Sequence, residues 1–240
     1  MSKSVRSLVF VALLTLGLVQ AAVAQDRRQN EPGEFDFYVL ALSWSPSFCE
    51  AASERPPSRG TTQQCGDRPF SFVVHGLWPQ YEAGFPEYCQ RNAPRPDGNT
   101  VASMLDLMPA TNLIFRQWEK HGTCAGIPAR GYFETVRKAR AAVRIPDEFV
   151  EVKEHLTVKP AEVEAAFVKA NPGLSSKGVA VACSGRRLSE VRVCMTKDFG
   201  FRDCAEIDRR ACTRSELVMP PVRAGRAAIL TQQPPVAQDP

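Results

Sequence analysis

The sequence predicts an α+β fold in one exported, disulfide-bonded domain. Segments typical of strands and of helices are mixed along the chain, without the regular alternation of a parallel α/β protein. All eight cysteines lie between residues 49 and 212, after a leader-like start. The length that follows this leader suits one ordinary domain with a hydrophobic core.

Residues 1–24 have the layout of a secretory signal peptide. Lys3 and Arg6 form a basic start, Leu8–Val19 is an apolar run, and Ala22–Ala24 is a small-residue cleavage site. The apolar run is shorter than the ~20 residues that a membrane span needs, so an uncleaved anchor is the less favoured alternative. We therefore expect an exported protein, periplasmic or extracellular, that has no membrane contact once the signal peptide is removed.

Four short segments predict strands because they are rich in aromatic and β-branched residues. They are Phe35–Trp44, Phe70–Val74, Gly178–Cys183 and Leu188–Cys194. Pro46 is expected to end the first strand. The polar residues 50–68 are then expected to form a loop before the second strand.

Three longer segments predict helices, at residues 112–122, 132–144 and 160–170. In the last two, apolar residues such as Phe133 with Val136, and Val163 with Phe167, recur at helical spacing. Residues 213–240 contain five prolines and little apolar periodicity, which predicts a flexible C-terminal tail.

The cysteines indicate disulfides rather than a metal centre. An even number in an exported chain is typical of a disulfide framework, here of four bonds. The chain has no Cys-x-x-Cys and no pair of histidines at ligand spacing, so we expect neither a metal ion nor a cofactor. The residues alone leave the pairing open. The cysteines are Cys49, Cys65, Cys89, Cys124, Cys183, Cys194, Cys204 and Cys212.

The chain has three histidines, and His75 follows directly on a predicted strand. Gly76 comes next and would let the backbone turn there. Trp78 offers a large flat face nearby, on which a nucleic-acid base could stack, although burial in the core is the commoner role of a tryptophan. We therefore treat His75 and Trp78 as candidate site residues.

His121 is the second candidate and lies at the end of a predicted helix. Gln117, Lys120, His121 and Cys124 fall at positions i, i+3, i+4 and i+7, which places them on one helix face. Gly122 is expected to stop the helix, and Cys124 to hold that end through a disulfide. The alternative is that both histidines are hydrogen-bonded residues of the core.

Two histidines and a lysine suit the cleavage of RNA through its own 2′-hydroxyl. The reaction needs a base for that proton, an acid for the departing 5′-oxygen and a cation for the charge on phosphorus. Imidazole has a free pKa of ~6.5 and takes either acid–base role near neutral pH. The nucleophile belongs to the substrate, so the reaction requires no metal and leaves DNA intact.

The other basic residues carry less information. The formal net charge of +4 is too small to indicate a nucleic-acid partner by itself. The group Arg137, Lys138, Arg140 and Arg144 could attract RNA, but a solvated helix face is the favoured interpretation. His155 lies in a charged segment and is expected at the surface.

Two segments closely resemble the signatures of the ribonuclease T2 family. FVVHGLWPQ (residues 72–80) is similar to the first catalytic segment of that family, and FRQWEKHGTC (residues 115–124) to the second. LALSWSPSFC (residues 40–49) and the run from Cys183 to Cys194 extend the likeness. It covers residues 35–212 as the catalytic domain, with residues 213–240 as the tail.

The resemblance implies an α+β fold built on an antiparallel sheet with packed helices. It implies that His121 is the general base, that His75 is the general acid and that Lys120 stabilises the transition state. The substrate would be single-stranded RNA, cleaved through a 2′,3′-cyclic phosphate to a 3′-phosphate, by a monomer. The resemblance also implies the disulfides Cys49–Cys65, Cys89–Cys124, Cys183–Cys212 and Cys194–Cys204.

The second segment departs from the family pattern at two positions. Gln117 stands where the family usually has a glutamate, and Arg116 where it often has a phosphate-binding histidine. Gln117 can donate a hydrogen bond to phosphate but cannot exchange a proton, whereas Arg116 keeps a fixed positive charge for substrate binding. We expect activity to survive. The alternative is a weakened RNA-binding or inhibitory protein on the same scaffold.

Overall fold

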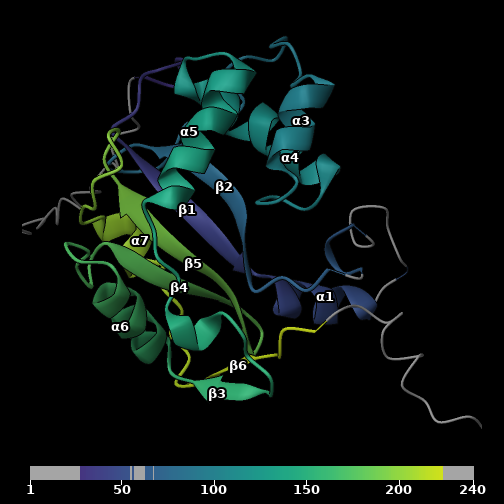
Figure 1. Ribbon diagram of the computed structural model, residues 1–240. Helices are drawn as coiled ribbons and strands as arrows, with labels where there is room; N and C mark the ends of the chain where they lie inside the picture. Colours follow the sequence, from purple (N-terminus) through teal and green to yellow (C-terminus); the bar gives the residue numbers. More distant parts are fainter. Residues whose placement is uncertain (1–27, 55, 57–62, 67, 224–240) are drawn as a thin grey trace, which may run out of the picture.

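The structure, a computed structural model, describes residues 28–54, 56, 63–66 and 68–223. Within these ranges six strands form one sheet, with helices around it (Figure 1). The strands are β1 (Phe37–Trp44), β2 (Phe72–Gln80), β3 (Leu156–Val158), β4 (Val179–Ser184), β5 (Arg187–Met195) and β6 (Leu217–Met219). The helices are α1 (Ser45–Ser53), α3 (Gly98–Met104), α4 (Thr111–Lys120), α5 (Ala129–Ala141), α6 (Pro160–Ala170) and α7 (Ala205–Arg209), with 3-10 turns η1 (Gly122–Ala125) and η2 (Asp147–Phe149). The predicted signal peptide lies outside the described residues.

The sheet confirms the predicted α+β class. Its strands follow the order β2-β1-β5-β6-β3, and β4 pairs with β5 beside this path. Pairing is antiparallel throughout, except where β5 meets β6 in parallel at Arg187 and Val218. The hairpin of β4 and β5 lies next to the hairpin-like pair of β1 and β2, so segments far apart in sequence build one central surface.

Strand β1 is buried on both faces of the sheet. Side chains alternate along a strand, and Leu40 and Leu42 point into the main core, while Phe37 and Val39 belong to a smaller cluster on the opposite face. Each is at most 2% exposed, and burying a side chain of this size contributes about 1.5–3 kcal/mol. A strand with two apolar faces is therefore suited to the centre of the sheet.

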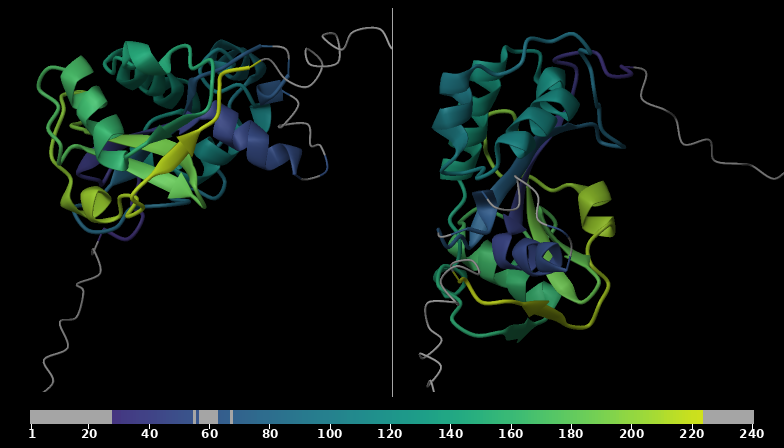
Figure 2. Two further views of the ribbon diagram at one scale, coloured as in Figure 1. Left: turned by 90° about the horizontal axis from the view of Figure 1, so that it is seen from below. Right: turned by 90° about the vertical axis from the view of Figure 1, so that its right-hand side faces the viewer.

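Helices cover both faces of this sheet. Helices α3, α4 and α5 gather at one end, and α6 packs beside β4 with Val163 and Phe167 buried in the main core (Figure 1). Helix α7 lies on the opposite side of the sheet from α6, as Figure 2 shows. Its Ile207 joins Phe37, Val39 and Cys194 in the smaller cluster. We call this side the α7 face.

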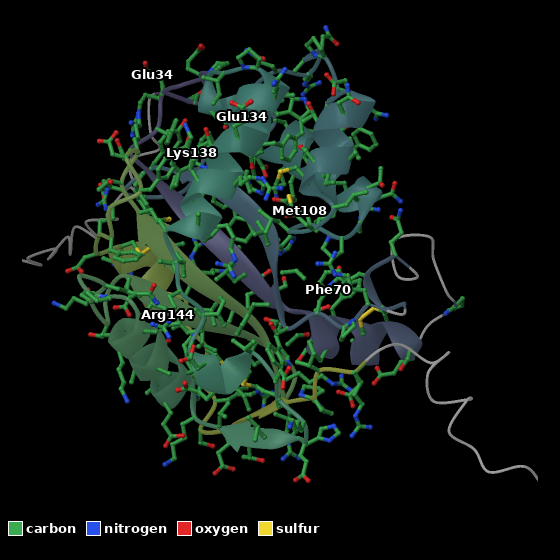
Figure 3. The ribbon with its side chains drawn as sticks, viewed as in Figure 1. Glu34, Phe70, Met108, Glu134, Lys138 and Arg144 are labelled. Carbon is green, nitrogen blue, oxygen red and sulfur yellow. A yellow bond between two sulfur atoms is a disulfide. The ribbon has the colours of Figure 1, made fainter. Side chains whose placement is uncertain are left out.

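The segment after β1 differs from the prediction. Strand β1 ends at Trp44 as expected, but residues 45–53 form α1 instead of leading into a loop. Pro46 stands in the first helical turn, where its missing N–H group costs nothing and its fixed φ suits the helix. Phe70, which Figure 3 labels beside α1, precedes β2, and β2 begins at Phe72 rather than Phe70.

The predicted flexible tail is wrong for residues 217–222. Leu217–Met219 form β6, which pairs with β3 and β5, and the Trp44 indole N–H donates to the Pro220 carbonyl at 3.0 Å. Leu217 and Met219 are at most 1% exposed. The folded domain therefore extends beyond Cys212, and residues 224–240 of the predicted tail lie outside the described residues.

Four disulfides close loops around the sheet, with the pairing that the resemblance implies: Cys49–Cys65, Cys89–Cys124, Cys183–Cys212 and Cys194–Cys204. Cys89–Cys124 spans 35 residues and ties the loop after β2 to η1. Closing a loop of this length contributes about 3–4 kcal/mol in the chain-entropy account. No helix among the described residues is both long and apolar enough to cross a membrane.

Candidate active site

His75 lies at a β-bulge inside β2, not at the end of a strand as predicted. Ala41 pairs with Gly76 and Leu42 with Val74, so His75 is left without a partner on β1. An inserted residue shifts the alternation of side chains. Val74 and Leu77 therefore both point into the main core although they are three positions apart, and His75, on the other face from Val74, reaches Glu190, a β5 residue of the α7 face.

A hydrogen bond to a buried carboxylate holds the His75 ring. The imidazole Nδ1–H donates to Glu190 Oε1, since a carboxylate accepts hydrogen bonds and cannot donate them. The other carboxylate oxygen accepts from Arg192 Nε and Nη2, both at 3.0 Å. Burial opposes ionisation of Glu190, but the hydrogen bond and charge of His75, together with Arg192, hold its pKa below the usual value. The site thus contains a buried carboxylate that stays ionised.

His121 occupies a different environment at the C-terminal end of α4. Its backbone N–H donates to the Gln117 carbonyl at 3.0 Å, and the residue is only 6% exposed. Its Nδ1 is buried and has no hydrogen-bond partner among the residues that the structure describes. Burial, followed by the positive charges of Lys120 and His75, lowers the pKa of His121 to about 3. This ring is therefore neutral at physiological pH.

Trp78 connects the two histidines. Its ring centroid lies 5.3 Å from that of His121 in a stacked arrangement and 5.5 Å from that of His75 in an edge-on one. The indole Nε1–H donates to Gln117 Oε1 at 2.8 Å, and the Arg192 guanidinium lies 5.4 Å from the centre of the ring. The structure thus brings four of the predicted site residues together.

Gly76 is required here for space rather than for an unusual backbone angle. A Cβ atom at this position would overlap with Gln117 Oε1 and Trp78 Nε1. The glycine therefore allows the end of α4 to approach β2 closely enough for the hydrogen bond between Gln117 and Trp78. This explains the sequence His-Gly-x-Trp better than the predicted turn, because β2 continues through Gly76.

Lys120 lies at the rim of the site. Its Nζ is 3.3 Å from Glu87 Oε2 and 5.7 Å from the centre of the Phe85 ring. The backbone N–H of Tyr88 donates to the Lys120 carbonyl at 2.9 Å, which fixes this loop against α4. Phe85 is 39% exposed, and its ring centroid is 6.2 Å from that of His121. An accessible aromatic face therefore adjoins the buried histidine.

The model of the ribonuclease T2 family matches residues 35–204. The chain belongs to the ribonuclease T2 family. It is a T2-type endoribonuclease, and the sequence resemblance is confirmed.

Relatives of this ribonuclease include bacterial enzymes. A ribonuclease of Aeromonas hydrophila is 32% identical over 192 residues, which cover 78% of this chain and 84% of the relative. Ribonuclease I of Escherichia coli is 26% identical over 80% of this chain and 85% of its own. A probable ribonuclease of Haemophilus influenzae is 36% identical over 129 residues, half of this chain and 47% of the relative.

Solved structures share the fold. An RNase-related protein from Calystegia sepium matches with a TM-score of 0.62 and 20% identity, over 78% of this chain and 98% of its own. RNase NT, solved in complex with 5′-AMP, matches with a TM-score of 0.55 and 21% identity, over 80% of this chain and 98% of its own. At these identities the likeness extends to the fold alone.

The other predicted residues of this T2 ribonuclease lie at the surface. Arg116 is exposed on α4, and its guanidinium makes no hydrogen bond or ion pair within the part of the chain that the structure describes. His155 is exposed, as expected. In the basic group, Arg137 of α5 pairs with Asp106, and Arg144, which follows that helix, pairs with Asp147. The solvated and paired face is thus the better interpretation of that group.

Three residues of the site were missed in the sequence. Glu190 and Arg192 stand two positions apart where the apolar part of β5 begins, and residues with this spacing point to the same face. That polar pair in a predicted strand could have indicated two further site residues. Phe85 lies in a segment without periodicity, and no pattern connected it to His121. Among the described residues, no group of three or more His, Cys, Asp or Glu side chains is placed to hold a metal ion.

Proposed function

We propose that this T2 ribonuclease cleaves single-stranded RNA by transesterification, without a metal ion or cofactor. The 2′-hydroxyl of the substrate attacks its own phosphorus and leaves a 2′,3′-cyclic phosphate, which water then opens to a 3′-phosphate. One observation carries the proposal: two imidazoles flank the Trp78 indole and have opposite electrostatic surroundings. Transesterification needs this asymmetry, because one ring must accept a proton while the other donates one.

His121 is the general base in this proposal. A base must be unprotonated when the substrate binds, and burial beside Lys120 lowers the pKa of His121 to about 3. The ring takes the proton of the 2′-hydroxyl as the bond between that oxygen and phosphorus forms. Lys120 then faces a developing negative charge, which an ammonium group stabilises most strongly where water is scarce.

His75 is the general acid. An acid must begin protonated, and a carboxylate in contact with an imidazole favours the imidazolium form. Nδ1 is held by Glu190, so Nε2 is the nitrogen available to the substrate. It donates its proton to the 5′-oxygen as the bond from phosphorus to that oxygen breaks. The two rings exchange these roles when water opens the cyclic phosphate.

Gln117 and Arg116 are assigned auxiliary roles. Gln117 is 6% exposed, and its side-chain oxygen is engaged by Trp78. The amide therefore orients the indole between the two histidines, and its remaining N–H groups are donors for phosphate. Arg116 is exposed one residue earlier and attracts the RNA backbone through its permanent charge.

The substrate is expected to be single-stranded because the site must reach a splayed base and sugar. Phe85 is exposed beside His121 and supplies a face on which a base can stack. Trp78 is partly buried and contacts both histidines, so its main role in this proposal is to separate and orient them. The enzyme is proposed to act as a monomer in the periplasm or outside the cell, where disulfides persist.

The test compares RNA with DNA in the presence of EDTA. We expect the purified protein to degrade single-stranded RNA under these conditions and to leave DNA intact. His121→Ala should lower the rate of RNA cleavage about 10²–10⁴-fold, which is the usual contribution of a general base. Full activity of that variant, or a metal requirement, would overturn the mechanism. An inert wild-type protein that still binds RNA would favour the binding or inhibitory alternative.

A further inference from the structure

We propose that Glu190 is a positioning residue for His75. Its carboxylate would fix the orientation of the ring and keep the proton on Nδ1, so that Nε2 delivers its proton to the leaving 5′-oxygen. This inference rests on the proposed function, because it takes the acid role of His75 as given. It adds a residue from β5, outside both of the segments that carry the chemistry in the sequence.

Both carboxylate oxygens of Glu190 form hydrogen bonds to residues of the site. Oε1 accepts from His75, and Oε2 accepts from Arg192 through two donors at 3.0 Å. The Glu190 side chain is 10% exposed, compared with 34% for that of His75. Arg192 in turn lies over Trp78. The carboxylate thus stands behind the histidine, on the side away from solvent, and is itself held in place.

The sheet does not need a carboxylate at this position. Glu190 is opposite Ser43 on β1 and Ala182 on β4, and neither side chain bonds to it among the described residues. Burying an unpaired carboxylate is strongly destabilising, whereas an apolar residue would suit a strand between two neighbours. Its described partners are the ring of His75 and the guanidinium that steadies it.

The chemistry of a carboxylate explains what it does to the ring. It accepts hydrogen bonds only, so the facing nitrogen must carry a proton, and its charge favours the imidazolium that an acid needs. A glutamine at this position would have one amide oxygen to face two groups of donors, His75 and Arg192. Either His75 or Arg192 would then meet the amide N–H₂ group, and the fixed tautomer of the ring would be lost.

A pair of substrates isolates the acid step. In a uridine-containing dinucleotide the leaving group is a ribose 5′-oxygen, which must be protonated as it departs. In uridine 3′-(4-nitrophenyl phosphate) the leaving phenolate needs no proton. Both substrates carry the same attacking sugar and base, so the ratio of their kcat/KM values reports on the acid alone. Both values scale with the concentration of folded enzyme, so their ratio does not depend on the fraction of protein that is folded.

We expect Glu190→Gln to lower kcat/KM about 10–100-fold on the dinucleotide, the range found for carboxylates that orient metal-ligating histidines, and by less than about threefold on the activated ester. Glu164→Gln is the matched control, because that carboxylate is half-buried on α6 and accepts from the Val181 N–H at 2.9 Å. It should leave the ratio unchanged. An equal loss on both substrates for Glu190→Gln, or no loss on either, would overturn the inference.

Two further variants separate this inference from the proposed function. His75→Ala should show the same selective loss, larger in size, and His121→Ala should lose activity on both substrates. If His75→Ala fails to discriminate, the acid role itself is wrong. If it discriminates and Glu190→Gln does not, only the positioning role fails. Should Glu190→Gln not fold, Arg192→Gln loosens the same carboxylate from a more exposed position, and an unchanged ratio there would refute the inference.

Discussion

The strand that carries His75 and the helix end that carries His121 give the same side chain opposite surroundings. The His75 side chain is 34% exposed and bonded to a buried carboxylate. His121 is 6% exposed, lies beside a lysine, and its Nδ1 finds no partner within the described ranges. One ring thus contacts a carboxylate, whereas burial keeps the other ring neutral. The acid and base roles can therefore be argued from the surroundings of each ring, in addition to the family resemblance.

The largest effect is expected from a substitution at the end of α4 that makes the surroundings of His121 less unlike those of His75. Lys120→Met removes a positive charge that lowers the pKa of His121, and it removes the cation proposed to stabilise the transition state. We expect kcat to fall by about 10²–10³-fold and the pKa of His121 to move upward in an NMR titration. Lys138→Met on the outer side of α5, labelled in Figure 3, is the matched control and should change neither quantity. An unchanged His121 pKa in Lys120→Met would contradict this account.

The close contact between strand β2 and the end of α4 can be disrupted by a substitution at Gly76. In Gly76→Ala the new methyl group overlaps with Gln117 and Trp78, so either the end of α4 or the indole must shift. We expect a loss of about 1–3 kcal/mol in the free energy of unfolding, as for other overpacked sites, measured by denaturant titration. Gly98→Ala is the control, because a Cβ there meets no atom within 4 Å and helix α3 begins at that residue. A stable, fully active Gly76→Ala would refute the close approach.

The neutral state of His121 also makes stability depend on pH. Below about pH 6.5 the unfolded chain binds a proton at this residue, whereas the folded chain does so only near pH 3. The contribution to stability is therefore complete above pH 6.5 and is lost as the pH falls, by about 1.4 kcal/mol per unit from this residue. Denaturant titrations between pH 7 and pH 4.5 measure this slope.

Two variants test whether His121 causes this dependence of the free energy of unfolding on pH. His121→Asn should flatten it by the amount that this residue contributes, because an amide does not titrate. His155→Asn, at an exposed position on the loop before β3, should leave it unchanged. If the dependence of stability on pH is the same in His121→Asn as in the wild type, the ring is already protonated in the folded protein at mildly acidic pH.

The smallest effect is expected at the rim. Glu87→Gln removes the partner that lies 3.3 Å from Lys120 Nζ. Both side chains are substantially exposed, at 38% and 43%, and pairs of this kind contribute at most about 1 kcal/mol. Thermal unfolding and kcat/KM on RNA should therefore change little. A loss comparable with that of Lys120→Met would mean that Glu87 takes part in the reaction.

Local patterns were sufficient for much of this fold. The spacing of apolar residues predicted α6 at its observed limits, and aromatic and β-branched residues predicted β1, β4 and β5 closely. The bulge at His75 depends on the register between β1 and β2, which no local pattern contains. Helix α1 was missed because a proline suits the first turn of a helix as well as the end of a strand. Strand β6 is held by pairing with distant β3 and β5.

The candidate site was predicted unevenly for the same reason. His75, Trp78, Gln117, Lys120 and His121 stand in two dense segments, and the structure brings those segments together. Glu190 and Arg192 come from a strand more than 60 residues further along the chain, and only the sheet register places them behind His75. Long-range contacts of this kind decide which histidine meets a carboxylate, so the difference between the rings was invisible in the sequence.

The chemical form of the RNA ends tests the central claim most directly. A single-stranded RNA oligonucleotide is incubated with the protein in EDTA, and the phosphorus resonances of the products are followed by NMR. We predict that 2′,3′-cyclic phosphate ends accumulate first and are then converted to 3′-phosphates, with both steps lost in His75→Ala and His121→Ala. Products with 5′-phosphate ends, or cleavage that begins only when a divalent metal is added, would contradict the two-histidine mechanism.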